Sequence, residues 1–396
     1  MSLRSLEGHR VLELGSYIAS PYAGHLLSHL GADVIKVEPF GGDPTRALFH
    51  GTPGGTFIAF SHGKRSICIN LASPEGHAVF GRLVASASIL IHNLAPESVR
   101  KLRVSHEDCH RLNPELVYCQ IAGYGPGPRE NEKITNPLVE AATGIMSSHR
   151  VDGRPTRLGP SYYDLFAGSN AVIGILSALV SRQTKMRRLE VGLYETGLHV
   201  SSKEIVGGQL EARAAQSGTA AKAGHEFGLP GYAAYATRDR RWIHLLMLSD
   251  SHWRDFCRAL GVRYSPELET IRGRQLHRTV SEDLVTNAVA ERDYDDIAAR
   301  LSAAGCSFTE VMQTADVLSD EHARHEGKTY PVRIGQQQYA MPSFPIRSDA
   351  QAVPPRGEVP QLGQHTMELL DALDYTAAQR QSLVSSGAVF ASPAPP

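Results

Sequence analysis

One acidic side chain, Asp164, stands alone at the start of a long apolar segment. It lies in the stretch GPSYYDLFAGSNAVIGILSALV, residues 159–180, and the next charge along the chain is Arg182. A carboxylate at the start of a helix can accept a hydrogen bond from a free backbone N–H group as a capping residue. It can also act as a nucleophile toward an acyl carbonyl. From these residues alone, both roles stay open.

The fingerprints of common cofactors are missing from the sequence. The first predicted strand-to-helix turn reads LGSYIASPYAG, in which Ser16 and Tyr17 follow Gly15, so it lacks the glycines of a dinucleotide site. No G-x-x-x-x-G-K-[ST] motif for phosphates occurs either. The most closely spaced histidines, His322 and His325, fit a solvated helix face better than a metal site. We therefore expect no nicotinamide, ATP or metal.

Composition and charge argue against two classes of partner. The 396 residues include 40 Lys and Arg against 41 Asp and Glu, and a net charge of -1 does not predict a large basic surface for nucleic acid. We see no apolar run of roughly 18 residues that would predict a membrane span, and no signal peptide. The five cysteines form no C-x-x-C pair, which is typical of free thiols in a reducing compartment. We expect a cytoplasmic protein of about two domains.

Strand-like and helix-like segments alternate ahead of Asp164. The strand-like segments are residues 9–15, 32–38, 65–71, 88–94 and 116–125, and the helix-like segments are 20–31 and 73–86. Both helices begin with a Ser-Pro pair, in which Ser20 and Ser73 are the predicted N-caps. This alternation predicts βαβ units with a parallel sheet, and hence an α/β fold.

Beyond Asp164, the sequence predicts a helix with a face of small residues and then a second region. The small residues recur at three- and four-residue steps: Gly168, Ala171, Gly174 and Ala178. They would let another backbone approach closely. The segment 209–224, rich in Ala, Gly, Ser and Gln, is a predicted linker. Two strands within 232–248 and a helix that ends at Gly261 predict a separate α+β unit after it.

Taken in order, these segments resemble the type III CoA-transferase family, whose superfamily includes formyl-CoA transferase, carnitine CoA-transferase and the α-methylacyl-CoA racemases. The resemblance covers nearly the whole chain. It rests on LEGHRVLELGSYIASPYAGHLLSHLGADVIKVEPFGGDPTR, GKRSICINLASPEG, HNLAPESVRKL, NPELVYCQIAGYGPGP, the segment around Asp164, RDRRWIHLLMLSDSHWRDFCRALG and PQLGQHT. It implies an interlocked homodimer. Each chain would have a large Rossmann-like CoA-binding domain (1–208 and 326–396), a linker (209–224) and a small α+β domain (225–325).

The resemblance implies reversible CoA transfer from an acyl-CoA donor to a carboxylic acid, with the CoA thioester as substrate and no permanently bound cofactor. In the family, the carboxylate that matches Asp164 attacks the thioester to give a mixed anhydride, which CoA converts into an aspartyl-CoA thioester. Succinyl-CoA or acetyl-CoA are the expected donors. A small dicarboxylate is the expected acceptor, because Arg154 and Arg157 precede Asp164 and a second carboxylate needs such a partner.

The resemblance also implies which residues bind the substrates. For CoA they are Ser16, Tyr17, Ile18 and Ala19 in the first turn, Lys64 and Arg65 at the phosphates, and Asn93, Gly123 and Tyr124. For the acid they are Glu140 and, within a segment that departs from the commoner family pattern, His225, Tyr232 and Tyr235. Arg46 matches a family arginine that serves either a phosphate or a structural ion pair.

Three alternatives stay open beside the transferase. A racemase of this superfamily uses a histidine and an aspartate as paired bases, but the matching positions hold Thr135 and Asn136, which cannot take up a proton. This departure favours the transferase. An isomerase would shift CoA between two carboxyls of one acid. A binding protein without activity is a further alternative, against which Asp164 and Lys64 argue. The glycine loop that some members close over the intermediate is replaced by MLSDSH, residues 247–252.

Overall fold

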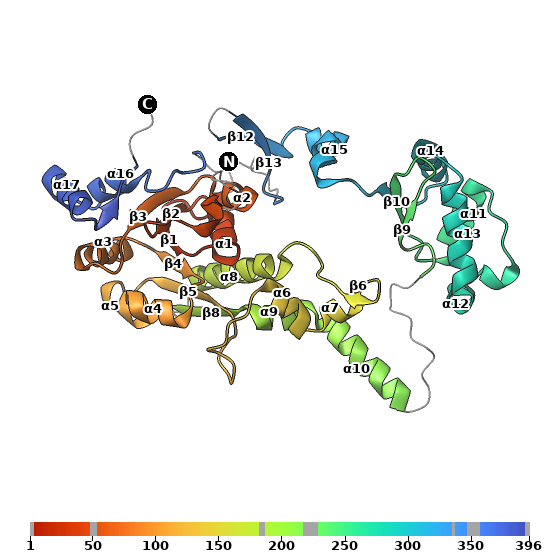
Figure 1. The fold of residues 1–396 in the computed structure, drawn as a ribbon, viewed down its shortest axis with the longest axis horizontal. Coiled ribbons are helices and arrows are strands. Elements are labelled where there is room, and N and C mark those ends of the chain that lie inside the picture. The colour runs from red at the N-terminus through yellow and green to blue at the C-terminus, as the bar shows by residue number, and fades with distance from the viewer. Residues whose placement is uncertain are drawn as a thin grey trace. The chain divides into compact units, whose positions relative to one another are not determined.

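The computed structural model of the chain describes residues 4–47, 54–181, 187–216, 229–334, 337–346 and 357–392 (Figure 1). The chain divides into two compact units. Unit 1 contains Met1–Gly207 and Glu326–Pro396, and unit 2 contains Gly208–His325.

A seven-stranded sheet forms the centre of unit 1. Its strands are β1 (Arg10–Leu14), β2 (Asp33–Glu38), β3 (Arg65–Ile69), β4 (Ile89–His92), β5 (Val117–Ala122), β8 (Arg188–Gly192) and β14 (Val389–Phe390). The spatial order is β14-β3-β2-β1-β4-β5-β8, and every neighbouring pair is parallel except β14 with β3. Because the order reverses between β1 and β4, the loops that follow these two strands diverge and leave room for a ligand. The predicted parallel α/β sheet is confirmed.

Helices cover both faces of this sheet. They are α1 (Ala19–His29), α2 (Gly55–Ser61), α3 (Pro74–Ala85), α4 (Pro96–Leu102), α5 (His106–Leu112), α6 (Asn136–Ala142), α7 (Ile145–Ser148), α8 (Tyr162–Val180), α9 (Leu193–Val200), α16 (Thr366–Asp371) and α17 (Ala377–Ser385). Along β1, Leu12 and Leu14 join a core with α3 and α16, whereas Val11 joins a second core with α1 and α8. A strand buried on both faces is apolar at successive positions, as these residues are.

Two short hairpins complete unit 1. They are β6 (Arg150–Val151) with β7 (Arg154–Pro155), and β12 (Thr329–Ile334) with β13 (Gln337–Pro342).

Helices α1 and α8 pack directly against each other. A Cβ atom at Gly168 would lie 2.7 Å from the carbonyl oxygen of Ala19, so only glycine fits at this crossing. The predicted close packing of the small-residue face is thus confirmed here. The predicted N-cap Ser20 is wrong, because the helix begins earlier, after Ile18, and Ser20 is buried inside it. Ser73 is an N-cap, and its side chain accepts from the Gly76 N–H.

Helix α8 differs from the expectation that no segment is long and apolar enough to predict a membrane span. An 18-residue window of this 19-residue helix has a mean hydropathy of 1.5, which would suffice to cross a membrane by length and composition alone. A core helix of a soluble protein passes the same test, and one face of α8 packs on α1, β5 and β8. The opposite face leaves three apolar side chains seven residues apart open, at 42% for Phe166, 62% for Ile173 and 76% for Val180.

The predicted linker is partly a helix. Helix α10 extends over Ser202–Gln216 and so includes the first half of segment 209–224. Alanine, glutamate and arginine favour helix within it and outweigh the two glycines, Gly207 and Gly208. Residues 217–224 lie outside the described ranges.

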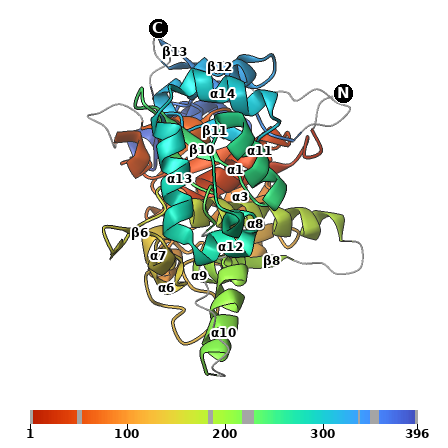
Figure 2. The ribbon, with the colours of Figure 1, turned by 90° about the vertical axis from the view of Figure 1, so that its right-hand side faces the viewer.

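Unit 2 is built on a small antiparallel sheet. The strands are β9 (Ala234–Ala236), β10 (Trp242–Leu245) and β11 (Phe308–Glu310), with β10 in the middle. The helices are α11 (Asp250–Leu260), α12 (Ile271–Leu276), α13 (Arg278–Ala290), α14 (Tyr294–Ala303) and α15 (Glu321–Arg324). Helices α11 and α13 share a core with the sheet around the buried Trp253. Figure 2 shows these two helices beside strands β10 and β11. The predicted strand pair and the helix ending at Gly261 are both present.

Candidate active site

The turn after β1 is locked to the loop after β4. Asn93 accepts a hydrogen bond from the Ser16 N–H at 3.1 Å and donates one to the Ser16 carbonyl at 2.9 Å. A Cβ atom at Gly15 would lie 2.3 Å from Ser20 Oγ and 2.8 Å from Asn93 Oδ1, so the close approach requires glycine there. Tyr17 follows with φ of 65°, an uncommon conformation for a residue with a side chain. The topological switch point therefore carries a rigid, strained turn.

A cavity of about 450 Å³ opens beside this turn, and we call it the aspartate cavity. It brings together six of the predicted site residues, which are Tyr17, Ile18, Ala19, Asn93, Gly123 and Asp164. Thr135, Asn136, Arg157 and Ser161 also line it. The resemblance predicted the first group, and the structure gathers it from four separate parts of unit 1.

Asp164 is the third residue of α8 and caps nothing. The N-cap position belongs to Ser161, whose side chain forms no capping hydrogen bond. Within the described ranges, the Asp164 carboxylate has no hydrogen bond or ion pair, and burial raises its pKa to about 6. The positive end of the α8 dipole favours the charged form but does not offset this burial. A poorly solvated carboxylate that is still mostly ionised above pH 7 suits nucleophilic attack.

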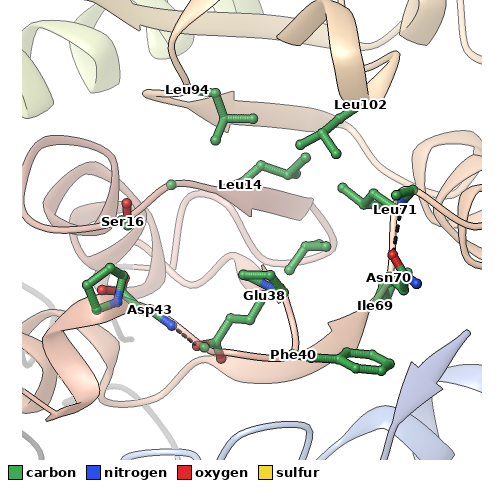
Figure 3. Close-up of a pocket in the computed structure, with 16 residues that line it drawn as sticks. Leu14, Ser16, Glu38, Phe40, Asp43, Ile69, Asn70, Leu71, Leu94 and Leu102 are labelled. Atoms are coloured by element: carbon green, nitrogen blue, oxygen red, sulfur yellow. Dashed lines mark hydrogen bonds between the residues drawn. The ribbon is translucent and has the colours of Figure 1, made fainter. Parts of the chain in front are cut away.

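A second cavity, of about 510 Å³, lies at the carboxyl ends of β1, β2 and β3, and we call it the strand-end cavity (Figure 3). Its wall is largely apolar and includes Leu14, Leu71, Leu94 and Leu102. Ser16 lines it as well, so the same turn borders both cavities. Sequence reasoning missed this cavity. A signal was present, because the chain reads Asn-Leu-Ala after both β3 (residues 70–72) and β4 (residues 93–95).

The polar part of this wall is already paired. Glu38 accepts two hydrogen bonds from Arg46, at 2.6 and 2.7 Å, one from Ser66 Oγ at 2.7 Å and one from the Asp43 N–H at 3.0 Å. Between the two roles left open for Arg46, the structural ion pair is the one observed.

Lys64 and Arg65, the predicted partners of the CoA phosphates, both form ion pairs within unit 1. Lys64 is fully buried, with its ammonium group bonded to Glu13 and to the Pro21 carbonyl at 2.8 Å. Arg65 is paired with Asp33 and, at 2.9 Å, with Glu368. The sequence does not reveal that the carboxylate of Glu13, on β1, reaches Lys64.

Other predicted residues have structural partners. Tyr124 is buried, with its ring 5.2 Å from that of Tyr194 and 4.5 Å from the Arg129 guanidinium carbon. Glu140 is buried, and each of its carboxylate oxygens accepts a hydrogen bond, one from the Asn136 amide and one from the Leu158 N–H. Both side chains therefore have partners within unit 1, and their predicted contacts with substrate stay predictions.

The remaining predicted acid-binding residues belong to unit 2 or lie outside the description. The Tyr235 hydroxyl accepts from the Gly231 N–H at 2.9 Å and donates to Glu282 at 2.7 Å, inside the core of unit 2. Tyr235 thus has a structural role there. The ring of Tyr232 packs on that of His244 at 5.7 Å. His225 lies outside the described residues.

Comparison with known proteins gives consistent relatives. The profile of CoA-transferase family III matches residues 6–366. Succinyl-CoA–D-citramalate CoA-transferase of Chloroflexus aurantiacus is 31% identical over 333 residues, 81% of each chain. Succinyl-CoA:mesaconate CoA-transferase of Haloarcula marismortui is 28% identical over 93% of this chain and 96% of its own length. A crystal structure of a CAIB/BAIF family protein from Brucella suis superposes with a TM-score of 0.80 at 26% identity, over 93% of this chain and 99% of the other.

Proposed function

The chain belongs to CoA-transferase family III and is an enzyme that transfers CoA, and we propose that it moves CoA from succinyl-CoA to a small dicarboxylic acid with Asp164 as the nucleophile. The single observation that carries this proposal is the aspartate cavity. It holds an unpaired, mostly ionised carboxylate, Asp164, and the guanidinium of Arg157 in one wall.

The proposed reaction is two matched exchanges. Asp164 attacks the carbonyl carbon of succinyl-CoA, the C–S bond breaks, and a mixed anhydride forms with release of the CoA thiolate. The thiolate then attacks the Asp164 carbonyl, so that succinate leaves and an aspartyl-CoA thioester remains. The carboxylate of the second acid attacks this thioester and gives a new anhydride and free thiolate. Attack of the thiolate on the acyl carbonyl of that acid gives the product thioester and restores Asp164.

We propose that CoA uses both cavities. The apolar strand-end cavity suits the less polar parts of CoA, and the Gly15–Ala19 turn leads from it to Asp164. Asn93 fixes this turn through its two hydrogen bonds with Ser16. The thioester would then reach the aspartate cavity with its carbonyl beside the carboxylate.

Two observations support a dicarboxylic acid as the acceptor. Both relatives named above carry dicarboxylic acids in their names, citramalate and mesaconate. In this chain, Arg157 lines the same cavity as Asp164 and its side chain is 48% exposed, so its guanidinium can meet a second carboxylate while the first one reacts.

The racemase alternative needs paired bases. Thr135 and Asn136 do line the aspartate cavity, but the Asn136 amide is held by Glu140 and the Tyr163 N–H. Neither side chain can move a proton at neutral pH. The transferase is therefore the better-supported proposal.

A matrix of substrates tests the proposed function. Several acyl-CoA donors would be combined with monocarboxylic and dicarboxylic acids, and new thioesters would be identified by mass spectrometry. We expect product with succinyl-CoA and short dicarboxylates. Transfer to monocarboxylates only would refute the proposed acceptor class. Exchange of the α-proton of a 2-methylacyl-CoA with heavy water, without transfer to any acid, would support the racemase instead.

We also propose that the enzyme is a homodimer with interlocked chains. The support in this structure is the open apolar face of α8, formed by Phe166, Ile173 and Val180. Apolar surface of this kind on a helix commonly marks a protein interface.

A further inference from the structure

Two buried polar side chains, Asn136 in the wall of the aspartate cavity and Glu140 beside it, take no part in the proposed chemistry. Asn136 and Glu140 lie one helical turn apart on α6 and are 2% and 1% exposed. The Asn136 amide donates from Nδ2 to Glu140 Oε1 at 2.6 Å. Burying a carboxylate and an amide costs folding free energy unless the two groups are hydrogen-bonded. The position of this pair therefore calls for a functional reason.

The pair is attached to the start of the helix that carries Asp164. Asn136 Oδ1 accepts a hydrogen bond from the Tyr163 N–H at 2.9 Å. The first N–H groups of a helix have no partner within the helix, and the Ser161 side chain supplies none to α8. Asn136 therefore caps α8 from another element, at the residue directly before Asp164.

Glu140 holds the approach to the same helix. Its second oxygen, Oε2, accepts from the Leu158 N–H at 2.8 Å. Its first oxygen lies 3.9 Å from Arg157 Nε. One carboxylate thus fixes the segment before α8 through the backbone, and fixes α8 itself through Asn136.

The directions of these hydrogen bonds are set by chemistry. A backbone N–H can only donate and an ionised carboxylate can only accept. The amide must therefore turn Oδ1 toward Tyr163 and Nδ2 toward Glu140, and Glu140 selects this orientation. Without the carboxylate, the amide is free to rotate and the cap is lost.

We propose that Asn136 and Glu140 are positioning residues that fix the start of α8 and thereby aim the Asp164 carboxylate into the cavity. This inference rests on the proposed function, in which Asp164 is the nucleophile. Neither residue touches the reacting atoms. Misplacement of a nucleophile lowers the rate of the chemical step more than it weakens binding of the donor.

A reciprocal exchange tests the inference. In the double variant N136D/E140Q, the new amide donates to the new carboxylate, and both carboxylate and amide oxygens still accept from Tyr163 and Leu158. Total charge is conserved. Each single variant instead loses at least one hydrogen bond. In N136D, two carboxylates face each other and neither can donate. In E140Q, the new NH2 group faces the Leu158 N–H, so two donors meet. We expect each single variant to lower kcat about tenfold, with an unchanged KM for succinyl-CoA. The double variant should return kcat to within about threefold of the wild type.

Hydrogen exchange of the amides of residues 158–165 supplies a readout that does not depend on activity. Exchange should be faster in both single variants and should return toward wild type in the double variant, while thermal unfolding confirms that all are folded. If a single variant does not fold, N136S takes its place, because a shorter side chain breaks the same cap. Losses of kcat that multiply in the double variant, or single variants with wild-type kcat, would overturn the inference.

D164A is assayed in parallel. An active D164A would contradict the proposed function itself, whereas an inactive D164A with unaffected single variants would contradict the positioning role alone.

Discussion

At the scale of single residues, Asp164 combines two opposing demands. A nucleophile must be ionised, yet burial raises the pKa of Asp164 to about 6. Poor solvation makes the carboxylate more reactive once it is charged. The enzyme thus keeps a charged group in a place where the fold disfavours the charge.

This pKa predicts how transfer depends on pH. The rate of a single turnover with succinyl-CoA should fall as the pH drops through about 6, because the protonated carboxyl group cannot attack. Above pH 7 the rate should be nearly constant until another group titrates. A rapid-quench series from pH 5 to 8 measures it, with circular dichroism as the check that the fold persists. Full activity at pH 5 would contradict the predicted ionisation.

Arg157 is the residue that should select the acid. Arg157→Gln removes the guanidinium from the cavity wall, and we expect KM for the dicarboxylate to rise about 10- to 100-fold, as for a lost charged hydrogen bond. Transfer to a monocarboxylate, if detectable, should change little. Arg154→Gln is the matched control, because Arg154 is exposed on β7 and does not line the cavity. Equal effects of the two variants would refute the assignment.

The sequence revealed only part of the site at this scale. The lone position of Asp164 and its motif sufficed to single it out. The roles of Lys64 and Glu140 were not accessible, because both depend on partners brought in by the fold. Glu13 reaches Lys64 across 51 positions of sequence, and the Leu158 N–H reaches Glu140 across 18. A charged residue in a loop-like stretch reads as exposed unless its buried partner is known.

At the scale of elements, buried lysines hold the start of the turn after β1 and the first residues of α1. Lys36 donates to the Gly15 carbonyl at 2.8 Å and Lys64 to the Pro21 carbonyl at 2.8 Å. Glu13 lies between them, with one carboxylate oxygen bonded to each lysine. Lys64 therefore positions the turn that borders both cavities. The Lys64 side chain is buried. Burial lowers its pKa to about 8, although the nearby Glu13 carboxylate acts to raise it.

Removal of this shared carboxylate should destabilise the protein. Glu13→Gln leaves two buried ammonium groups without their common counter-charge, and we expect a loss of about 3–5 kcal/mol in the free energy of unfolding. Urea denaturation measures it. Glu7→Gln is the control, because Glu7 forms a surface pair with Arg4 and should change stability by less than about 1 kcal/mol. Similar losses in both variants would contradict the role of the network.

Most elements were predictable, and the errors have identifiable causes. Strands buried on both faces appear as short apolar runs, and Ser73 and Gly261 mark helix ends by local chemistry alone. The start of α1 was misplaced because Ser20 resembles an N-cap while the strained Tyr17 turn lets the helix begin sooner. The helix in 209–216 was missed because the segment 209–224, taken as a whole with Gly218 and Gly224, suggests a linker.

At the scale of the whole molecule, the open apolar face of α8 needs a cover. Its residues Phe166, Ile173 and Val180 are spaced seven apart, so they lie along one side of the helix. A single chain does not bury them within the described residues. The partner chain of an interlocked dimer would cover this face. In the sequence, only the family resemblance suggests such a dimer, because contacts between chains produce no recognisable spacing of residues.

Exchange of subunits tests the interlocked architecture. Tagged and untagged protein would be mixed at nanomolar concentration for days, and the tagged chains then isolated. Interlocked chains cannot separate without large-scale unfolding, so mixed dimers should form only after denaturation and refolding. Rapid mixing under native conditions, or a monomer on dilution, would exclude interlocking.

The central claim is that Asp164 itself joins the reaction covalently. In the proposed sequence, the carboxylate of the accepting acid becomes the bridging oxygen of the anhydride, and the final attack of CoA leaves that oxygen on Asp164. The decisive measurement uses an acid labelled with ¹⁸O in its carboxylates, together with succinyl-CoA, and reads the mass of the peptide that contains Asp164. We expect label to enter Asp164 only when succinyl-CoA is present. Product formation over many turnovers with no label in Asp164 would contradict it.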